Sequence, residues 1–376
     1  MRTISPFAVV STERPVGSPE PRRVVHMDLD CFYAAVEELE DPRLRGKPIA
    51  VVMGLDVRGR GVVTTASYAA RALGVRGAMP LTTARQLCPD LIALPVRHAL
   101  YREYSRRVMM VLGDLSPVIQ QISIDEAFVE VRVAGDVVAL ARNTRDRIMA
   151  DIGLSASFGI ATSKLVAKIA TSQGKPRGFV TVLPGEEAAF LAPLAVDVLW
   201  GVGPRTGERL RDLGIGTLGE LAVTEPSALA STFGPRRALE LCQSAQGIDE
   251  SPLDTDRRTK SISAEQTLAG EADPRRLWAL FREMAADVSH RLRQHRLLAR
   301  TVGIKLRRAD WSLMTREQSL PRPVNDPERI AAVAAALMRA HWRRGAPLRL
   351  VGIRVSGLTS PTEAEQLPLF PDHQIT

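Results

Sequence analysis

The chain of 376 residues lacks any apolar run long enough to cross a membrane, and it has only three cysteines and few aromatic residues. The sequence therefore predicts no transmembrane helix. Cysteines 31, 88 and 242 have no metal-ligand spacing, which argues against a zinc site or a disulfide framework and indicates a reducing compartment. Residues 1–21 lack the apolar core of a signal peptide, so we interpret them as a disordered leader without an assignable function.

Positive charge is concentrated in one part of the chain. Residues 257–358 contain 21 Lys and Arg against 9 Asp and Glu, a balance of +12, while the whole chain carries +8 and the remainder therefore carries −4. A solvated basic face is the alternative interpretation of this excess. An imbalance on the scale of a domain instead favours contact with a polyanion, because phosphate attraction of this kind supplies nucleic-acid affinity.

The first part of the chain has the strand and helix order of a ferredoxin-like sheet. An insert at residues 41–96 interrupts an otherwise regular β-α-β-β-α-β pattern, which is typical of an antiparallel sheet backed by helices. We expect strands at residues 24–30, 118–123, 128–133 and 155–160, and helices at residues 32–40, 97–112, 137–151 and 163–171. Within the insert we expect strands at 49–53 and 61–66 and a helix at 67–73.

The second part of the chain changes character twice. Residues 184–248 are predicted to be helical with short loops, and residues 249–259 are polar and turn-rich, as in a linker. A second β-α-β-β-α-β pattern occupies residues 260–358, which hold the basic excess. Residues 359–376 are again typical of a flexible tail.

Acidic side chains recur in two stretches, "MDLD" and "SIDEAF". In the first strand Asp28 and Asp30 share one face, and Asp125 and Glu126 lie near the bend of the predicted hairpin. If this hairpin lies beside the first strand, Asp28, Asp125 and Glu126 can converge, and three adjacent carboxylates need a cation. Oxygen ligands without His or Cys suit Mg²⁺. Two solvated acidic turns are the alternative interpretation.

Five longer motifs then resemble one family. In order, "MDLDCFYAAVEE", "TTASYAARALGVRGAMP", "ISIDEAF", "SFGIATSKLVAKIAT" and "LWGVGPRTGERLRDLGI" resemble the Y-family DNA polymerases, especially the bacterial DNA polymerase IV (DinB-like) branch. The resemblance runs from about residue 22 to residue 358. It implies an α+β, multi-domain right-hand polymerase. Its parts would be a ferredoxin-like palm (22–40 and 97–183), small fingers (41–96), a helix-hairpin-helix thumb (184–248) and a little finger (260–358).

The resemblance also implies roles for individual residues. Asp28, Asp125 and Glu126 match the catalytic and metal-binding carboxylates, and the carbonyl of Leu29 matches a further metal ligand, for two Mg²⁺ ions with Mn²⁺ as a substitute. Tyr33 matches the steric gate, an aromatic ring that leaves no room for a ribose 2′-OH. The implied nucleotide-binding residues are Cys31, Phe32, Tyr33, Thr64, Tyr68, Arg71 and Lys175. The implied DNA-binding residues of the thumb are Gly201, Gly203 and Arg205.

The tail carries the peptide "QLPLF". Gln366, Leu367, Leu369 and Phe370 resemble the peptide by which bacterial polymerases bind the sliding clamp. The hypothesis is therefore a cytoplasmic, nucleoid-associated and monomeric DNA polymerase for low-fidelity translesion synthesis, which adds dNTPs to a primer-template by two-metal-ion catalysis. The alternatives are a nucleotidyl cyclase-like two-metal enzyme on the same palm and a non-catalytic DNA-binding repair scaffold. Neither alternative needs the full set of motifs.

Overall fold

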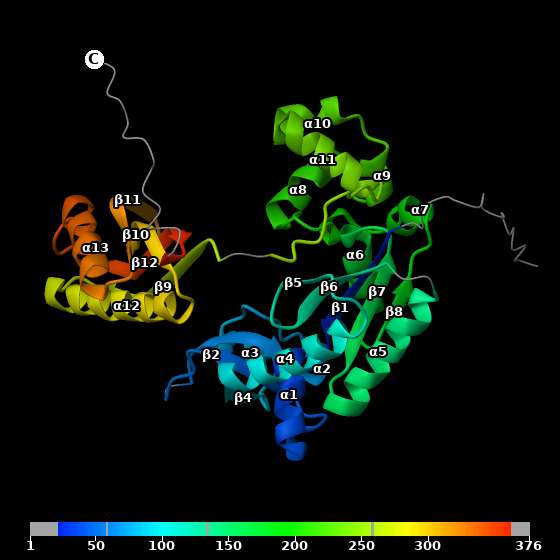
Figure 1. Cartoon of the computed structure of the whole chain (residues 1–376), viewed down its shortest axis with the longest axis horizontal. Coiled ribbons are helices and arrows are strands. Elements are labelled where there is room, and N and C mark those ends of the chain that lie inside the picture. The colour runs from blue at the N-terminus through cyan, green and yellow to red at the C-terminus, as the bar shows by residue number, and fades with distance from the viewer. Residues whose placement is uncertain (1–21, 58, 133–134, 257–258, 362–376) are drawn as a thin grey trace, which may run out of the picture. The chain divides into compact units, whose positions relative to one another are not determined.

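The computed structural model describes residues 22–361, except residues 58, 133, 134, 257 and 258 (Figure 1). The chain forms two compact units, Met1–Thr255 and Asp256–Thr376. The boundary lies within the stretch 249–259 that the sequence predicts to be a linker. Unit 1 contains two sheets and unit 2 contains one. No helix of the described residues is long and apolar enough to span a bilayer.

The larger sheet of unit 1 has the order β5-β6-β1-β7-β8, with β1 at its centre (Figure 1). Four of its strands are antiparallel neighbours in the predicted ferredoxin-like order. The fifth strand, β8, pairs with β7 in parallel and lies outside the predicted pattern. The strands are β1 (Arg23–Leu29), β5 (Ile119–Gln121), β6 (Glu126–Val131), β7 (Ala156–Ala161) and β8 (Phe179–Thr181).

Helices cover both faces of this sheet. Val25, Met27 and Leu29 of β1 lie in one core with residues of α1, α4 and α5. On the opposite face, α6 packs against β1 and β7, so His26 is 1% exposed and the predicted polar face of β1 is largely buried. Asp30 lies beyond the end of the strand. The helices are α1 (Phe32–Glu40), α4 (His98–Gly113), α5 (Val137–Ile152) and α6 (Lys164–Gly174).

The insert forms a small sheet of its own, with the order β3-β2-β4. The sequence predicts β2 (Ile49–Met53), β3 (Val62–Ala66) and α2 (Tyr68–Ala72), each within a residue or two of its observed bounds. The sequence analysis misses α3 (Leu81–Leu87) and β4 (Ile92–Pro95). The strand β4 has only four residues and pairs in parallel with β2, so no hairpin turn marks it in the sequence. A short 3₁₀ helix, η1 (Pro42–Leu44), follows α1.

The rest of unit 1 is helical, as predicted. Its helices pack their apolar residues against α6, so that they share one core with the larger sheet. The elements are α7 (Glu187–Leu191), η2 (Val196–Val198), α8 (Pro204–Asp212), α9 (Leu218–Ala222), α10 (Pro226–Phe233) and α11 (Pro235–Ala245).

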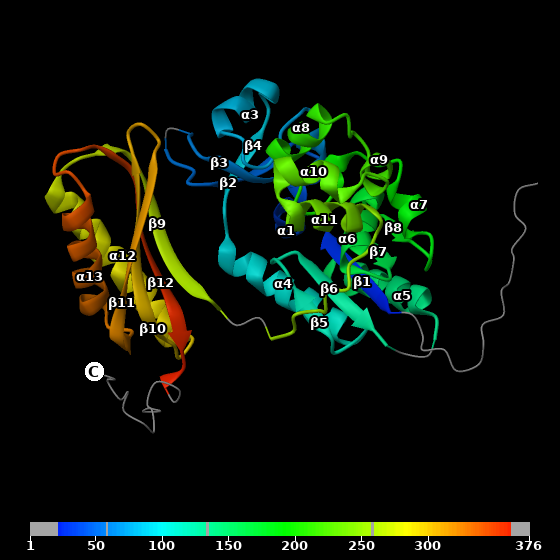
Figure 2. The same cartoon turned by 90° about the horizontal axis from the view of Figure 1, so that it is seen from above.

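Unit 2 follows the predicted β-α-β-β-α-β order, but its antiparallel sheet has the order β11-β10-β12-β9, with the first strand at an edge. Its two helices lie on one side of that sheet (Figure 2). The elements are β9 (Ser261–Glu271), α12 (Pro274–Gln294), β10 (Leu298–Arg308), β11 (Leu313–Val324), α13 (Pro327–His341) and β12 (Leu348–Thr359).

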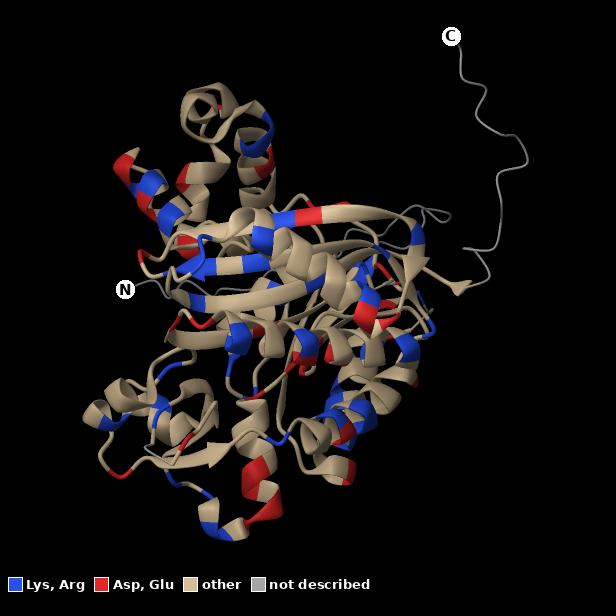
Figure 3. Ribbon diagram, turned by 90° about the vertical axis from the view of Figure 1, so that its left-hand side faces the viewer, with Lys and Arg blue, Asp and Glu red and all other residues tan. Residues whose placement is uncertain are grey.

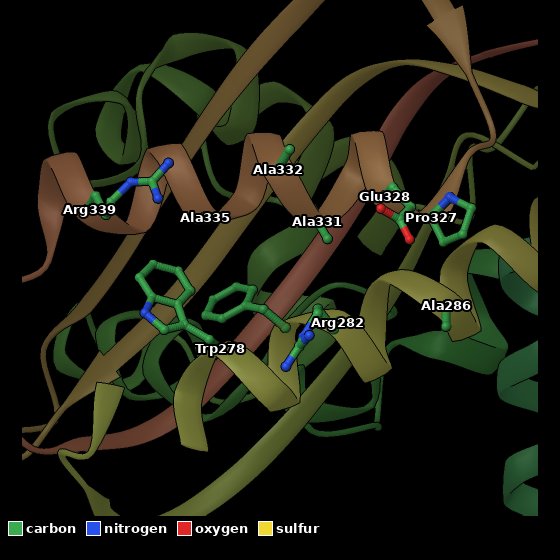
Figure 4. A pocket seen from close by; sticks show the side chains of 10 residues that line it. Trp278, Arg282, Ala286, Pro327, Glu328, Ala331, Ala332, Ala335 and Arg339 are labelled. Carbon is green, nitrogen blue, oxygen red and sulfur yellow. The ribbon is translucent and has the colours of Figure 1, made fainter. Parts of the chain in front are cut away.

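Between α12 and α13 runs a groove of about 580 Å³ (Figure 4). Trp278 and Phe281 of α12 form its apolar floor, and three alanines of α13 line the opposite wall. Arg339 lies over the Trp278 ring, 5.9 Å from the ring centroid.

The face of the unit 2 sheet away from its helices is polar. Along β10, Val302, Ile304 and Leu306 are buried, and the alternating residues Lys305 and Arg307 are half-buried. Arg354 of β12 pairs with Gly303 and is exposed. Figure 3 marks the Lys and Arg residues in blue, and the unit 2 strands carry several of them. This face therefore carries cations on a surface free of helices in its own unit, and one of them, Lys305, is paired with Glu265 over 2.8 Å.

Candidate active site

The pairing of β1 with β6 brings together acidic residues that lie about one hundred positions apart in the sequence. Asp28 is directly opposite Glu126 in the antiparallel register. One residue further on, the N–H of Leu29 donates a hydrogen bond of 3.0 Å to the carbonyl of Asp125. The neighbourhood predicted for Asp28, Asp125 and Glu126 therefore follows from the backbone ladder itself.

Cationic and hydroxyl side chains hold these three carboxylates. Lys175 forms an ion pair of 2.5 Å with Asp28, and Lys168 forms an ion pair with Glu126. The hydroxyl of Ser123 lies 2.5 Å from Oδ1 of Asp125. Among the described residues, no three His, Cys, Asp or Glu side chains group closely enough to hold a metal ion. The carboxylates are engaged with these partners rather than turned toward one common point.

The close carboxylates nevertheless favour a nearby positive charge, because that charge offsets their mutual repulsion. Burial raises the pKa of Asp28, and the nearby Asp125 adds to that shift, whereas Lys175 opposes it. Burial also lowers the pKa of Lys168, so its ammonium is held at a cost in solvation. Carboxylates at the adjoining ends of two paired strands, with cations drawn onto them, are a donor set that fits a divalent hard cation.

A buried histidine orients Glu126. Nε2 of His26 lies 2.9 Å from Oε1 of Glu126, and Nδ1 lies 2.8 Å from Oγ1 of Thr171 on α6. Burial lowers the pKa of His26 to about 3, and Lys168 contributes to the shift, so the ring is neutral near pH 7. Because a carboxylate only accepts, the proton belongs on Nε2, and Nδ1 accepts from the Thr171 hydroxyl.

The predicted steric gate lies at the first turn of α1. Tyr33 is half-buried, and its ring stacks on Tyr101 of α4. Burial raises the pKa of Tyr33, and the charge of Asp125 adds to the shift. Cys31 precedes the helix in a left-handed conformation and is half-buried. Phe32 is only 1% exposed, and its side chain lies in the core.

The predicted phosphate-binding groups come from two different elements. The Tyr68 hydroxyl of α2 donates to Oδ1 of Asp30 over 3.2 Å, and the Arg71 guanidinium lies over the Tyr68 ring, 5.1 Å from the centroid. Arg71 also donates to the carbonyl of Ala66. Lys175 follows α6 and contacts Asp28. Tyr68 and Arg71 therefore share a helix face, as their spacing predicts.

A hollow of about 660 Å³ adjoins these groups in the insert. Thr64, Thr65 and Ala66 line it together with Tyr68 and Arg71. The lining combines small residues with three large side chains, those of Tyr68, Arg71 and Arg76.

The Gly-Val-Gly turn precedes α8. Gly201 has φ of +88°, and its carbonyl accepts a hydrogen bond from Arg237, whereas Gly203 caps the helix and has open space where a side chain would begin. Arg205 is exposed on the first turn. The open backbone at this helix N-terminus is suited to a phosphate. The peptide 366–370 lies outside the described residues.

Sequence reasoning missed several partners of the site. His26 alternates with Asp28 on one face of β1, which is a weak signal, whereas Lys168 lies on a helix and gave no signal of its contact with Glu126. The sequence carries no signal for the roles of Tyr101 and Glu37. An apolar helix face predicts that a side chain is buried, but it does not predict which side chains it contacts. Trp200, whose ring lies 5.5 Å from the Lys168 ammonium, gave no signal either.

Comparison with known proteins matches most of the chain. Residues 27–172 match the impB/mucB/samB family, residues 184–215 match its HHH motif and residues 259–369 match its C-terminal domain. The chain is 40% identical to DNA polymerase IV of Dehalococcoides mccartyi strain CBDB1 over 358 residues, which cover 93% of this chain and 90% of that protein. It is 41% identical to DNA polymerase IV of Halorhodospira halophila over 352 residues, which cover 92% and 97%.

Solved structures give a matching picture. A Y-family DNA polymerase chimera superposes with a TM-score of 0.79 and 26% identity, covering 90% of this chain and 99% of the chimera. DinB from Sulfolobus solfataricus superposes with a TM-score of 0.63 and 26% identity, covering 89% of this chain and 98% of that protein.

Proposed function

The chain belongs to the impB/mucB/samB family of Y-family DNA polymerases, and from this premise we propose how it carries out templated DNA synthesis. It is a DNA-directed DNA polymerase for translesion synthesis. A cyclase-like enzyme and a non-catalytic scaffold are not favoured, because the similarity extends over about nine tenths of the chain and includes the helix-hairpin-helix region and unit 2. The observation that carries the catalytic proposal is the register of Asp28 against Glu126.

In the proposed reaction a primer 3′-OH attacks the α-phosphate of a dNTP in line, and pyrophosphate leaves. Asp28, Asp125, Glu126 and the carbonyl of Leu29 would hold two Mg²⁺ ions, or Mn²⁺ in their place, whose chemistry is to activate the hydroxyl and stabilise the leaving phosphate. His26 keeps the Glu126 carboxylate oriented by donating to it from the buried side.

The nucleotide would be held by residues of both α2 and the palm. Arg71 offers a planar pair of donors for phosphate, Lys175 offers an ammonium, and Tyr68 offers a hydroxyl. Tyr33, fixed by its stack on Tyr101, would exclude a ribose 2′-OH. The hollow beside Thr64 supports the low-fidelity part of the proposal, because small side chains leave room for damaged or misaligned bases. Cys31 and Phe32, at the start of α1, are proposed to complete this set.

DNA would be gripped by its phosphate backbone. The Gly201–Gly203 turn with Arg205 and the helix-free face of the unit 2 sheet are the surfaces that we assign to this contact. We accordingly propose a division of the chain into palm, fingers, thumb, little finger and tail, with the bounds that the sequence predicts. The peptide 366–370 is proposed to bind the sliding clamp of the cell, and the enzyme is proposed to act as a monomer in the cytoplasm at the nucleoid.

Primer extension tests the proposal. Purified protein, Mg²⁺, primed template and dNTPs should give stepwise extension, on an undamaged template and on one with a lesion at the first templating base. A cyclase-like enzyme would instead convert a nucleoside triphosphate alone, and a scaffold would bind the primed template without extending it. No extension at micromolar enzyme, with binding intact, would overturn the proposed function.

A further inference from the structure

One buried carboxylate near the site is not used by the proposed metal or nucleotide contacts. Asp30 is 3% exposed and lies two residues beyond Asp28, at the point where β1 meets α1. Four hydrogen-bond donors converge on it, and all four come from segments distant in the sequence. A buried aspartate with this many donors is a fixed point, because moving it would leave several polar groups without partners.

The two oxygens of Asp30 serve different sides of the site. Oδ1 accepts from the Tyr68 hydroxyl over 3.2 Å and from the Ser157 hydroxyl over 2.8 Å. Oδ2 accepts from the backbone N–H of Arg177 over 2.9 Å and from the Ser155 hydroxyl over 2.6 Å. The serines belong to β7 and the segment before it, so they anchor Asp30 to the rigid sheet. The other two donors belong to segments that are proposed to bind the triphosphate.

The segment 175–177 contacts the end of β1 at two positions. Residues 175 and 177 are two apart, as are their partners Asp28 and Asp30. The Lys175 side chain contacts Asp28, and the Arg177 backbone contacts Asp30. Tyr68 reaches Asp30 from α2, on the other side. Asp30, Tyr68 and Arg177 also line one cavity of about 790 Å³, so this hydrogen-bonded group of residues borders open space.

We infer that Asp30 is a positioning residue for the incoming nucleotide, which fixes Tyr68 and the Lys175 segment to the sheet that carries Asp28. This inference rests on the proposed function. Asp30 touches neither substrate nor metal, and it acts through groups that do. Pre-ordering of these groups lowers the entropic cost of binding a flexible triphosphate, so the predicted consequence is a lower KM for dNTP.

Asp30→Asn selectively tests the hydrogen bond between Asp30 and the Tyr68 hydroxyl. The amide nitrogen cannot face Arg177, because two N–H donors would then meet, but hydroxyl groups can reverse and accept from it. The amide should therefore turn toward Tyr68 and Ser157 and leave the Arg177 bond in place. A charge-assisted bond to Tyr68 becomes a neutral one, which is weaker by about half.

The experiment compares wild type, Asp30→Asn, Tyr68→Phe and the double variant in single-nucleotide incorporation, with Asp90→Asn as an exposed, matched control. We expect Asp30→Asn to raise the dNTP KM about fivefold, with kcat within about twofold, since the lost interaction is ground-state positioning. In the Tyr68→Phe background the same substitution should leave KM unchanged, because its effect passes through the hydroxyl. Primer-template affinity should match that of Asp90→Asn, whereas Tm should fall slightly, because the neutral amide makes weaker hydrogen bonds than the buried carboxylate.

Two results would overturn the inference. One is an Asp30→Asn effect on KM that is equally large without the Tyr68 hydroxyl. The other is a fall in kcat, DNA affinity and Tm together, which indicates a purely structural role. If Asp30→Asn does not fold, Tyr68→Phe alone tests the inference. An unchanged KM in Tyr68→Phe would show that the Tyr68 hydroxyl, through which Asp30 is inferred to act, does not contribute to dNTP binding. Wild type is measured first, so a failure of polymerase activity itself is recognised separately.

Discussion

The rings of Tyr33 and Tyr101 are stacked, with centroids 4.1 Å apart and planes inclined by 13°. Tyr101 is fully buried, and its hydroxyl donates to Glu37 of α1, which also receives Arg97. Tyr33, the proposed gate, is therefore held by a second ring whose own position is fixed by a buried carboxylate. An aromatic pair contributes about 0.5–1.5 kcal/mol beyond its buried area.

Replacing the gate itself should change sugar selection. In Tyr33→Ala, the ratio of rNTP to dNTP incorporation should rise by about 100-fold or more, because the ring that would collide with a 2′-OH is gone. Single-nucleotide kinetics with both sugars measures the ratio. Tyr33→Phe retains the ring and should stay close to wild type. An unchanged ratio in the alanine variant would remove the gate from Tyr33.

Loosening the support should have a smaller effect of the same kind. Tyr101→Leu removes the ring that stacks on Tyr33, so the proposed gate gains freedom and the rNTP to dNTP ratio should rise by about fivefold, in keeping with a stacking energy near 1 kcal/mol. Tyr101→Phe keeps the stack and loses only the bond to Glu37. It is the control for the leucine variant. Equal ratios in both variants would show that the stack does not set selectivity.

Loss of one carboxylate should abolish synthesis without loss of DNA binding. In Asp125→Ala we expect extension to fall by at least about 10³-fold, because charge that develops during phosphoryl transfer is no longer balanced. Removal of divalent cations with a chelator should have the same effect on wild type and be reversed by added Mg²⁺. Binding of primed template, measured by anisotropy, serves as the folding control. Extension that persists in EDTA would contradict the metal assignment.

Deletion of residues 366–370 tests the proposed clamp peptide. These residues follow the last strand, β12, in the sequence, so distributive synthesis should stay at the wild-type level, while stimulation by added sliding clamp should disappear. Substitution of Leu369 and Phe370 by Ala should reproduce the deletion, since apolar anchors dominate such peptide contacts. Replacement of Asp372 by Ala is the matched control within the tail. Stimulation that survives the deletion places the clamp contact elsewhere.

The sequence predicts local elements well because their signals are local. The bounds of β2 agree with the prediction, and β5 lies within the predicted strand 118–123, whereas β6 begins at Glu126, two residues before the predicted start. The acidic neighbourhood of Asp28 follows from the hairpin of β5 and β6, since a ferredoxin-like order places it beside β1. The short parallel strands β4 and β8 escape prediction, because parallel pairing depends on distant contacts rather than on a turn.

The order of elements does not determine the order of strands. Both larger sheets arise from β-α-β-β-α-β, yet β1 lies at the centre of its sheet and β9 lies at the edge of the other. In each sheet the first strand pairs with the last strand of the pattern, and the remaining neighbours differ. Partners of buried polar groups are equally non-local. His26 meets Glu126 and Asp30 meets Arg177 only after the sheet has formed, so no local pattern reports them.

A glycine in β7 permits the contact that holds His26. Gly159 is opposite His26 in the β1–β7 pairing, and a Cβ added there would collide with the carbonyl of Ala167 and lie 2.6 Å from Oγ1 of Thr171. Both neighbours belong to α6, so the helix lies closer to the strand at this position than any residue with a Cβ atom would allow. The neutral His26 ring reaches Thr171 on α6 through this approach.

Gly159→Ala should therefore lower the free energy of unfolding by about 2–3 kcal/mol, the usual cost of forcing an atom into a packed core. Displacement of α6 should also shift Thr171 away from His26, so activity should fall in the protein that remains folded. Gly113→Ala is the matched control, because Gly113 ends α4 with nothing within 4 Å of an added Cβ. That variant should gain about 0.5–1 kcal/mol from reduced freedom of the unfolded chain. Denaturant unfolding of both variants measures the difference, and equal stabilities would show that α6 can move away from β7 without cost.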